Sequence, residues 1–227
     1  HYIMGGVKVH ADTQMTTAPG LFAAGECAAG LHGANRLGGN SLWDLLVFGK
    51  LAGEHAAQYA KANANVSIND KEVDAIAKDA LAPFERDLNN SNENPFQIQH
   101  DLQDMMQDLV GIARTGSELE EAITKMEGLW ARAAKAASGG NRGFNPGWHT
   151  ALELKHMLTV AEAIARAALE RKESRGGHYR EDFPDKSAEF GKVNTSLVKD
   201  ASGKMTIRQV QKEKMREDLQ QLIEEFK

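Results

Sequence analysis

Apolar and polar positions divide this chain into regions of different texture. Up to about Ala60 the sequence is rich in glycine and places short apolar runs between turns, which is typical of α/β structure. From about Ser67 to Arg171 the apolar residues recur with the period of an α-helix. A charged and aromatic segment follows over 173–184, and two alternating runs and a charged helix come last. The pattern predicts an α+β fold that is mostly helical.

The first region is expected to contain two short strands and one helix. Val7–Val9 alternates like a short strand, and the run LFAA over 21–24 is typical of a short buried strand. Asn40 or Ser41 can cap a helix that runs roughly over 42–59.

The middle region predicts a small antiparallel helical bundle. Its helices are expected over about 70–88, 95–113, 117–139 and 146–172. Pro83 should interrupt or bend the first of them. The second and the fourth begin with an asparagine cap followed by proline, and the pair Ser117 and Glu120 has the spacing of a capping box for the third. We expect Met105, Met106, Trp130 and Trp148 to fill the core of this bundle.

The C-terminal region predicts a strand pair over about 192–199 and 204–210, joined by a turn at 200–203, and then a helix from about Gln211. The changes of texture place domain boundaries near residues 62 and 172, so that the expected domains are 1–62, 63–172 and 173–227.

Composition limits the class of protein. The chain has 227 residues, 41% of them hydrophobic, and a formal net charge of −5, which suits one substantial core or two modest domains and argues against nucleic acid as the main partner. Cys27 is the single cysteine and excludes an internal disulfide. Asp44 breaks the longest apolar run, Leu42–Phe48, so no membrane span is predicted and the chain should be soluble by itself. The histidines show no metal-ligand spacing.

The loop LHGANRLGGNSL over 31–42 carries the strongest candidate chemistry. Arg36 offers a planar fork for a carboxylate, and the glycines beside it let the backbone approach a ligand. The helix that begins near Ser41 adds free backbone N–H groups that favour an anion. The alternatives are a surface salt bridge for Arg36 and an ordinary buried helix at Ser41.

Two further residues could act in binding. His1 precedes the glycine turn of HYIMGG and could bind a carboxylate or move a proton near neutral pH, or it could be a disordered terminal residue. Glu26 follows a short apolar run and could bind the sugar hydroxyls of a nucleotide cofactor, or it could be an ordinary surface carboxylate.

Four motifs in this order, HYIMGG, GLFAAGEC, LHGANRLGGNSL and ESRGGHYREDFP, give the chain a family resemblance. It resembles the C-terminal part of the flavoprotein subunit of succinate dehydrogenase or fumarate reductase over essentially its whole length. L-aspartate oxidases share HGANR and the SRG-H-Y run. The resemblance implies the remnant of an α/β FAD-binding domain over 1–62, followed by the helical bundle and a small α+β C-terminal domain.

The resemblance also implies roles for individual residues. His1 and Arg36 would hold the dicarboxylate substrate, and Glu26, Ser41 and Leu42 would contact FAD. Asn35 would shape the loop between flavin and substrate. The segment 173–184 would be ordered beside the flavin or the capping domain, with Arg175 and His178 buried.

The implied reaction is hydride transfer between succinate, or fumarate in reverse, and FAD. The implied partners are an iron–sulfur subunit and membrane anchor subunits, with the protein peripheral on the cytoplasmic side of the membrane. No G-x-G-x-x-G fingerprint occurs in the chain, and the family's FAD-linking histidine and its capping domain with a proton-delivering arginine are absent. We therefore expect a fragment that is inert alone and holds FAD weakly or not at all. The alternatives are a fragment of L-aspartate oxidase and a non-catalytic helical interaction module.

Overall fold

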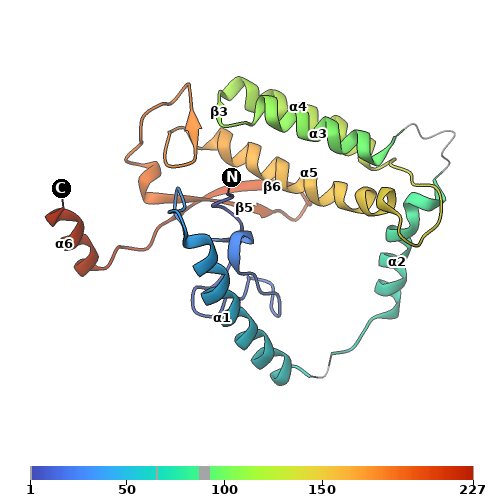
Figure 1. Cartoon of the computed structure of the whole chain (residues 1–227), viewed down its shortest axis with the longest axis horizontal. Helices are drawn as coiled ribbons and strands as arrows, with labels where there is room; N and C mark the ends of the chain where they lie inside the picture. Colours follow the sequence, from blue (N-terminus) through green and yellow to red (C-terminus); the bar gives the residue numbers. More distant parts are fainter. Residues whose placement is uncertain (1, 65, 87–92, 227) are drawn as a thin grey trace. The chain divides into compact units, whose positions relative to one another are not determined.

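The computed structural model describes residues 2–64, 66–86 and 93–226. These residues form two compact units, one that ends at Ile76 and one that begins at Ala77. The fold is mostly helical with small sheets, as the sequence predicts (Figure 1). None of the helices in the described residues is long and apolar enough to cross a membrane.

The first unit places a small parallel strand pair beside one long helix. Strand β1 (Val7–Lys8) pairs in parallel with β2 (Ala28–Ala29), and a short 3-10 helix, η1 (Gly25–Cys27), packs against helix α1 (Asn40–Ala62). Gly25 has a φ of 77°, and a Cβ atom there would lie 2.5 Å from Leu45 Cδ2 of α1. Glycine is therefore required where the chain turns against the helix.

Two predictions for the first unit are wrong. The run over 21–24 is not a strand, and its ladder pairing within the described residues is limited to one isolated antiparallel bridge, between Met15 and Phe22. An apolar run without a neighbouring strand cannot complete a ladder, and the strand that pairs with β1 comes after Gly25. The cap of α1 is Gly39, with a φ of 83°, and neither Asn40 nor Ser41, which lie in the first turn.

Helix α2 (Asp70–Glu85) contains Pro83 and continues past it, so of the two expected outcomes, an interruption or a bend, the interruption is not seen. Two bonds from the second unit hold its last turns: Ser138 N donates to Pro83 O at 2.8 Å, and Trp148 Nε1 donates to Ala80 O at 2.7 Å. Because Pro83 lies close to the end of α2, few hydrogen bonds of the helix depend on its missing N–H group. The final residues of the expected helix, 87 and 88, lie outside the described residues.

The second unit is built on three helices that lie side by side (Figure 1), namely α3 (Pro95–Leu109), α4 (Gly116–Ala133) and α5 (Pro146–Glu170). The predicted caps of α3 and α5 are confirmed, because the side chains of Asn94 and Asn145 accept bonds from backbone N–H groups of the first turn. The predicted capping box of α4 is wrong.

The capping box of α4 is formed by Thr115 and Glu118. Thr115 has extended backbone angles and its side chain accepts from Glu118 N, whereas Ser117 lies inside the first turn of the helix. The sequence contains two overlapping threonine- or serine-x-x-glutamate patterns, and the pattern alone cannot choose between them. The helix ends at Ala133, before the expected glycine pair.

The hydrophobic core belongs to the second unit. Apart from Pro83 and Pro95, every buried hydrophobic side chain among the described residues lies at Ile98 or beyond. Fully buried aliphatic side chains come from all three helices, for example Ile98, Leu119 and Leu158. Met105 is buried as predicted, whereas Met106 and Trp130 are partly buried against the core and Trp148 is half-buried.

The segment over 173–184 is ordered, as predicted. Strand β3 (Ala113–Arg114) pairs in parallel with β4 (Tyr179–Arg180), which joins this segment to the start of α4. Its buried charges are Glu173 and Arg180, with 0% and 1% of each residue exposed. Arg175 and His178, which were expected to be buried, are half-buried. Their polar ends are held by Glu173 and by Arg171 O at the end of α5, and the rest of each residue is partly exposed.

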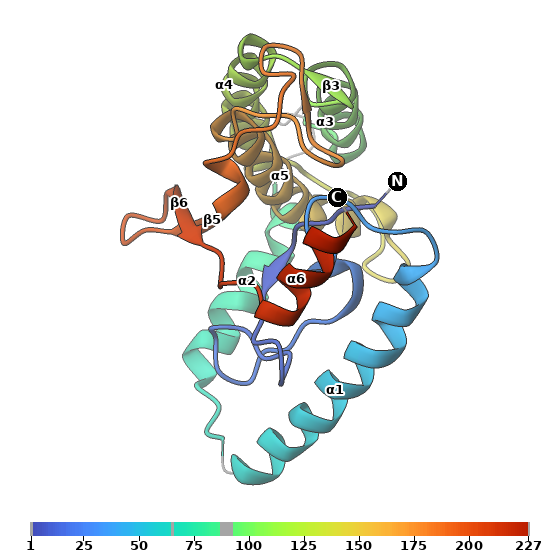
Figure 2. The ribbon, with the colours of Figure 1, turned by 90° about the vertical axis from the view of Figure 1, so that its left-hand side faces the viewer.

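The chain ends with a hairpin and a helix. After the 3-10 helix η2 (Phe190–Lys192), strands β5 (Val193–Lys199) and β6 (Met205–Gln211) pair antiparallel around the predicted turn. Helix α6 (Glu217–Glu225) follows an extended segment (Figure 2). It begins at Glu217 and not near Gln211, because Gln211 belongs to β6 and residues 212–216 form neither helix nor strand.

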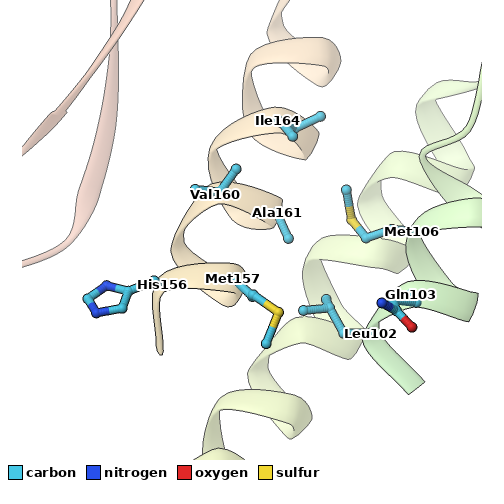
Figure 3. A pocket seen from close by; sticks show the side chains of 8 residues that line it. All are labelled: Leu102, Gln103, Met106, His156, Met157, Val160, Ala161 and Ile164. Atoms are coloured by element: carbon cyan, nitrogen blue, oxygen red, sulfur yellow. The ribbon is translucent and has the colours of Figure 1, made fainter. Parts of the chain in front are cut away.

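An apolar groove of about 430 Å³ runs between α3 and α5 (Figure 3). Gln103 and His156 are the polar residues in its lining, and the other side chains are aliphatic or methionine. A binding site normally combines apolar walls with a few convergent polar groups. The groove offers no such set.

Candidate functional site

The first unit presents a glycine-rich loop that leads directly into the N-terminus of α1. The loop over 30–39 contains no helix or strand, and Gly39 turns it into the helix with a φ of 83°. No side chain caps the helix start. Asn40 N donates to Leu37 O at 3.2 Å, whereas the N–H groups of Ser41 and Leu42 remain available to an acceptor, and the helix dipole favours negative charge there.

Ser41 and Leu42 occupy this first turn. Ser41 is half-buried, whereas Leu42 has 69% of its surface exposed. The next residue, Trp43, is 67% exposed. The helix start therefore offers both free N–H donors and an open apolar surface, a combination that suits a flat aromatic ligand with polar edges.

Arg36 is half-buried and incompletely paired. Its Nη1 donates to Leu37 O at 3.2 Å, and this is its single hydrogen bond within the described residues. Its Nε is buried and has no hydrogen-bond partner among them. Because a buried donor without a partner is costly, this atom is suited to a ligand oxygen. The Nε–Nη2 edge of the guanidinium is a two-donor fork of the kind that binds a carboxylate.

The aromatic ring of Tyr2 supports Arg36 from one side. The guanidinium carbon lies 4.6 Å from the ring centroid, within the range of a cation–π contact. The phenol donates to Asp44 Oδ2 at 3.1 Å. Burial raises the pKa of Tyr2 above its ordinary value, and the hydrogen bond and charge of Asp44 raise this pKa further. The phenol is therefore a proton donor at neutral pH.

Asp44 and His32 complete a cluster around this phenol. The side chains of His32 and Asp44 are 7% and 5% exposed, and His32 Nε2 lies 3.2 Å from Asp44 Oδ2. His32 Nε2 also lies 3.2 Å from Tyr2 Oη, and the two rings meet edge to face. The cluster joins the HYIMGG segment, the loop and α1 at one point.

Glu26 connects two of the predicted motifs. Its Oε1 accepts a bond from Ile3 N at 3.0 Å, and the residue is otherwise exposed. Asn35 is exposed, and its backbone N–H donates to His32 O at 3.2 Å within the loop. His1 lies outside the described residues.

The structure thus brings Arg36, Ser41 and Leu42 together at the loop and the helix start. Sequence reasoning missed the cluster of Tyr2, His32 and Asp44. A signal was present, since Asp44 is a charged residue within the apolar run Leu42–Phe48. A carboxylate in such a run is costly to bury unless it is paired. Among the described residues, no group of three or more histidine, cysteine or acidic residues could hold a metal ion.

The residues at the helix start fit FAD. The uncapped N-terminus of α1 can meet the electron-rich edge of a flavin, and the exposed Leu42 can meet its ring. Residues 1–42 match the family of FAD binding domains. Fold and site together define a flavoprotein, and FAD is its cofactor.

The sequence of the second unit identifies the family. Residues 99–223, more than half of the chain, match the family described as fumarate reductase flavoprotein C-term. The chain therefore belongs to the fumarate reductase flavoprotein family, and its sequence corresponds to the C-terminal part of the succinate dehydrogenase or fumarate reductase flavoprotein subunit.

Individual relatives agree with this assignment. The chain is 42% identical over 189 residues to the fumarate reductase flavoprotein subunit of Haemophilus influenzae, which covers 82% of this chain and 31% of that subunit. It is 39% identical over 214 residues to the subunit of the same name from Mycobacterium tuberculosis, covering 91% of this chain and 36% of the relative. The chain thus spans about a third of the length of these relatives.

A solved structure shows the same fold. The Mycobacterium smegmatis Sdh1 structure in complex with UQ1 is similar with a TM-score of 0.89 and 43% identity, over 99% of this chain and 38% of that chain.

Proposed function

We propose that the native protein containing these residues interconverts succinate and fumarate by hydride transfer with FAD. The observation that carries the proposal is Arg36, a half-buried arginine with an unpaired Nε that lies in the loop before the uncapped start of α1. A dicarboxylate supplies acceptor oxygens for the Nε donor that has no partner, and the helix start is suited to the flavin.

Arg36 would bind one carboxylate through its Nε–Nη2 edge, because Nη1 is already bonded to Leu37 O. Such a two-point contact fixes both the position and the orientation of the substrate. Holding the reacting carbon close to its acceptor in this way supplies a large part of the rate enhancement of many enzymes, roughly 7–11 kcal/mol in favourable cases. By resemblance, His1 would bind the other carboxylate.

FAD, when bound, accepts or donates the hydride, and by resemblance the accompanying proton would pass to or from the arginine of the family's capping domain. The backbone N–H groups of Ser41 and Leu42 would face the flavin ring, and Glu26 would bind hydroxyl groups of the cofactor through its free carboxylate oxygen. Asn35 would hold the loop between flavin and substrate. These assignments rest on family resemblance and are supported by the open helix start and by the exposure of Glu26.

The remaining proposals concern the context of this chain. Helix α1 exposes Leu42, Trp43 and Leu46, each by about two thirds of its surface. Apolar surface of this extent along one helix is normally covered. We infer that FAD and further parts of the subunit cover it, that iron–sulfur and membrane anchor subunits accept the electrons, and that the protein is peripheral on the cytoplasmic side of a membrane. We also propose that the 227-residue chain alone is inert.

Substitution of Arg36 tests the proposed reaction. In the native flavoprotein, Arg36→Lys should lower kcat/KM for succinate by about 100-fold or more, because an ammonium cannot form the planar two-point contact. Flavin content should not change. Arg142→Lys, at an exposed arginine of the bundle, is the matched control and should leave the rate unaltered. Activity with L-aspartate in place of succinate would favour the related L-aspartate oxidase reaction and contradict the proposal.

A visible spectrum tests the proposal for the chain alone. The purified 227-residue chain, mixed with FAD and passed through a desalting column, should retain no stoichiometric flavin band. A retained band together with succinate-dependent bleaching would show that these residues are sufficient for catalysis.

A further inference from the structure

Asp44 is a buried carboxylate that does not cap its own helix, α1. Helix α1 begins at Asn40, so Asp44 lies beyond the first turn, where a side chain can no longer cap the helix start. The residue is nevertheless 5% exposed. A buried carboxylate is retained only with partners that compensate for its lost hydration, and its partners therefore indicate its role.

Both partners of Asp44 lead to Arg36. Tyr2 donates to Asp44 Oδ2 at 3.1 Å, and its ring lies against the Arg36 guanidinium at 4.6 Å. His32, which contacts Asp44 Oδ2 at 3.2 Å, belongs to the same loop as Arg36. Asp44 thus holds the Tyr2 ring, against which the Arg36 guanidinium lies. It also holds His32, which belongs to the loop that contains Arg36.

Among the described residues, the Arg36 side chain makes one hydrogen bond and one cation–π contact. Its one hydrogen bond within the described residues goes to the carbonyl of the next residue, which belongs to the same loop and moves with it. The Tyr2 ring gives it a cation–π contact outside the loop. If Tyr2 rotated, the Nε–Nη2 edge would no longer have a defined direction.

We propose that Asp44 is a positioning residue for the dicarboxylate site, which acts through Tyr2 and His32 to hold the Arg36 guanidinium in its carboxylate-binding orientation. This inference rests on the proposed function, since it takes Arg36 to be the carboxylate ligand. Asp44 itself touches neither substrate nor flavin in this scheme. Its effect should therefore depend on the presence of Arg36.

A double-mutant cycle on the native flavoprotein tests this dependence. The probe is malonate, a dicarboxylate without a CH–CH bond to oxidise, and its Kd is measured by calorimetry. Asp44→Asn should weaken malonate binding about tenfold, a typical coupling between linked residues. In the Arg36→Lys background the same change should have almost no further effect. Glu54→Gln, at an exposed carboxylate of the same helix, is the control and should not change the Kd.

Steady-state kinetics separate positioning from a general structural role. Asp44→Asn should raise KM for succinate more than it lowers kcat, with flavin content and Tm unchanged. Tyr2→Phe keeps the ring under Arg36 and removes the phenol, so it should weaken malonate binding about threefold. If Asp44→Asn does not fold, the malonate Kd of Tyr2→Phe tests the proposed positioning role instead.

The outcomes distinguish this inference from the proposed function. Equal weakening by Asp44→Asn with and without Arg36 would overturn the inference, and so would an unchanged Kd in both Asp44→Asn and Tyr2→Phe. If Arg36→Lys itself left malonate binding intact, the proposed function would fail and the inference with it. If Arg36→Lys weakened binding and the other two variants did not, the inference alone would fail.

Discussion

Substitution of Glu173 tests whether buried ion pairs and hydrogen bonds stabilise the C-terminal part of the second unit. Its carboxylate is fully buried and accepts bonds from Arg171 Nε at 2.9 Å, from Arg175 Nε at 3.0 Å and from Ser187 N at 2.9 Å. Burial alone raises its pKa, but the bonds from Arg175, Ser187 and Arg171 outweigh burial and lower the pKa to about 2. We predict that Glu173→Gln strongly destabilises the second unit.

The magnitude follows from this pKa. The ordinary value is 4.5 and the folded value is about 2. One pH unit of difference is worth about 1.4 kcal/mol, so the ionised carboxylate contributes about 3 kcal/mol to the free energy of unfolding. Because the folded pKa is depressed, this contribution is complete above pH 4.5 and is lost as the pH falls toward 2. Removing one partner of a buried ion pair costs a similar amount, about 3–5 kcal/mol.

The assay is urea unfolding of the 227-residue chain, followed by far-UV circular dichroism between pH 7 and pH 3, with hydrogen exchange of 171–190 as a local readout. Glu173→Gln should lose about 3 kcal/mol at pH 7 and should show a weaker dependence on pH below 4.5 than the unsubstituted chain. Glu189→Gln removes an exposed ion pair with Lys192 and should cost less than about 1 kcal/mol. Equal losses in the two variants, with parallel pH profiles, would refute the reasoning.

Three further predictions concern the helical bundle, and urea unfolding of the same chain measures each. Thr115→Ala should cost about 1 kcal/mol through loss of the capping box, whereas Ser117→Ala should cost less; the reverse order would contradict the assignment of the cap. Trp148→Phe removes the bond from Nε1 to Ala80 O and should cost roughly 1–2 kcal/mol, so an unchanged midpoint would show that this bond is unimportant. Leu158→Ala should cost about 2–5 kcal/mol because the side chain is fully buried, and a loss below 1 kcal/mol would indicate that the core closes around the cavity.

The helices of the bundle could be predicted well because their signals are local. Asparagine followed by proline gives a cap and a preset first dihedral angle, and both Asn94 and Asn145 are caps in the structure. Where two local signals overlap, as at Thr115 and Ser117, the sequence does not decide between them. The run over 21–24 could not be predicted from local signals, since a strand depends on a partner strand from another part of the chain.

In the candidate site, too, one part could be predicted from local sequence and the other could not. Motif and chemistry are sufficient to single out Arg36, because the residue type and its glycine neighbours lie together in sequence. The support beneath it could not be predicted, since Tyr2, His32 and Asp44 come from three separate segments. Their contact depends on how α1 begins, and Gly39, which sets that start, does not carry the side-chain signal of a usual cap.

The two units also differ in what a substitution should reveal. All buried hydrophobic side chains of the described residues lie in the second unit, so changes such as Glu173→Gln should register as lost stability. In the first unit the buried side chains that matter are polar, and its long helix is largely exposed. A change at Asp44 removes little apolar burial, and its main consequence falls on the direction of the Arg36 guanidinium. Ligand affinity is therefore the sensitive measurement for the first unit, and the free energy of unfolding is the sensitive one for the second.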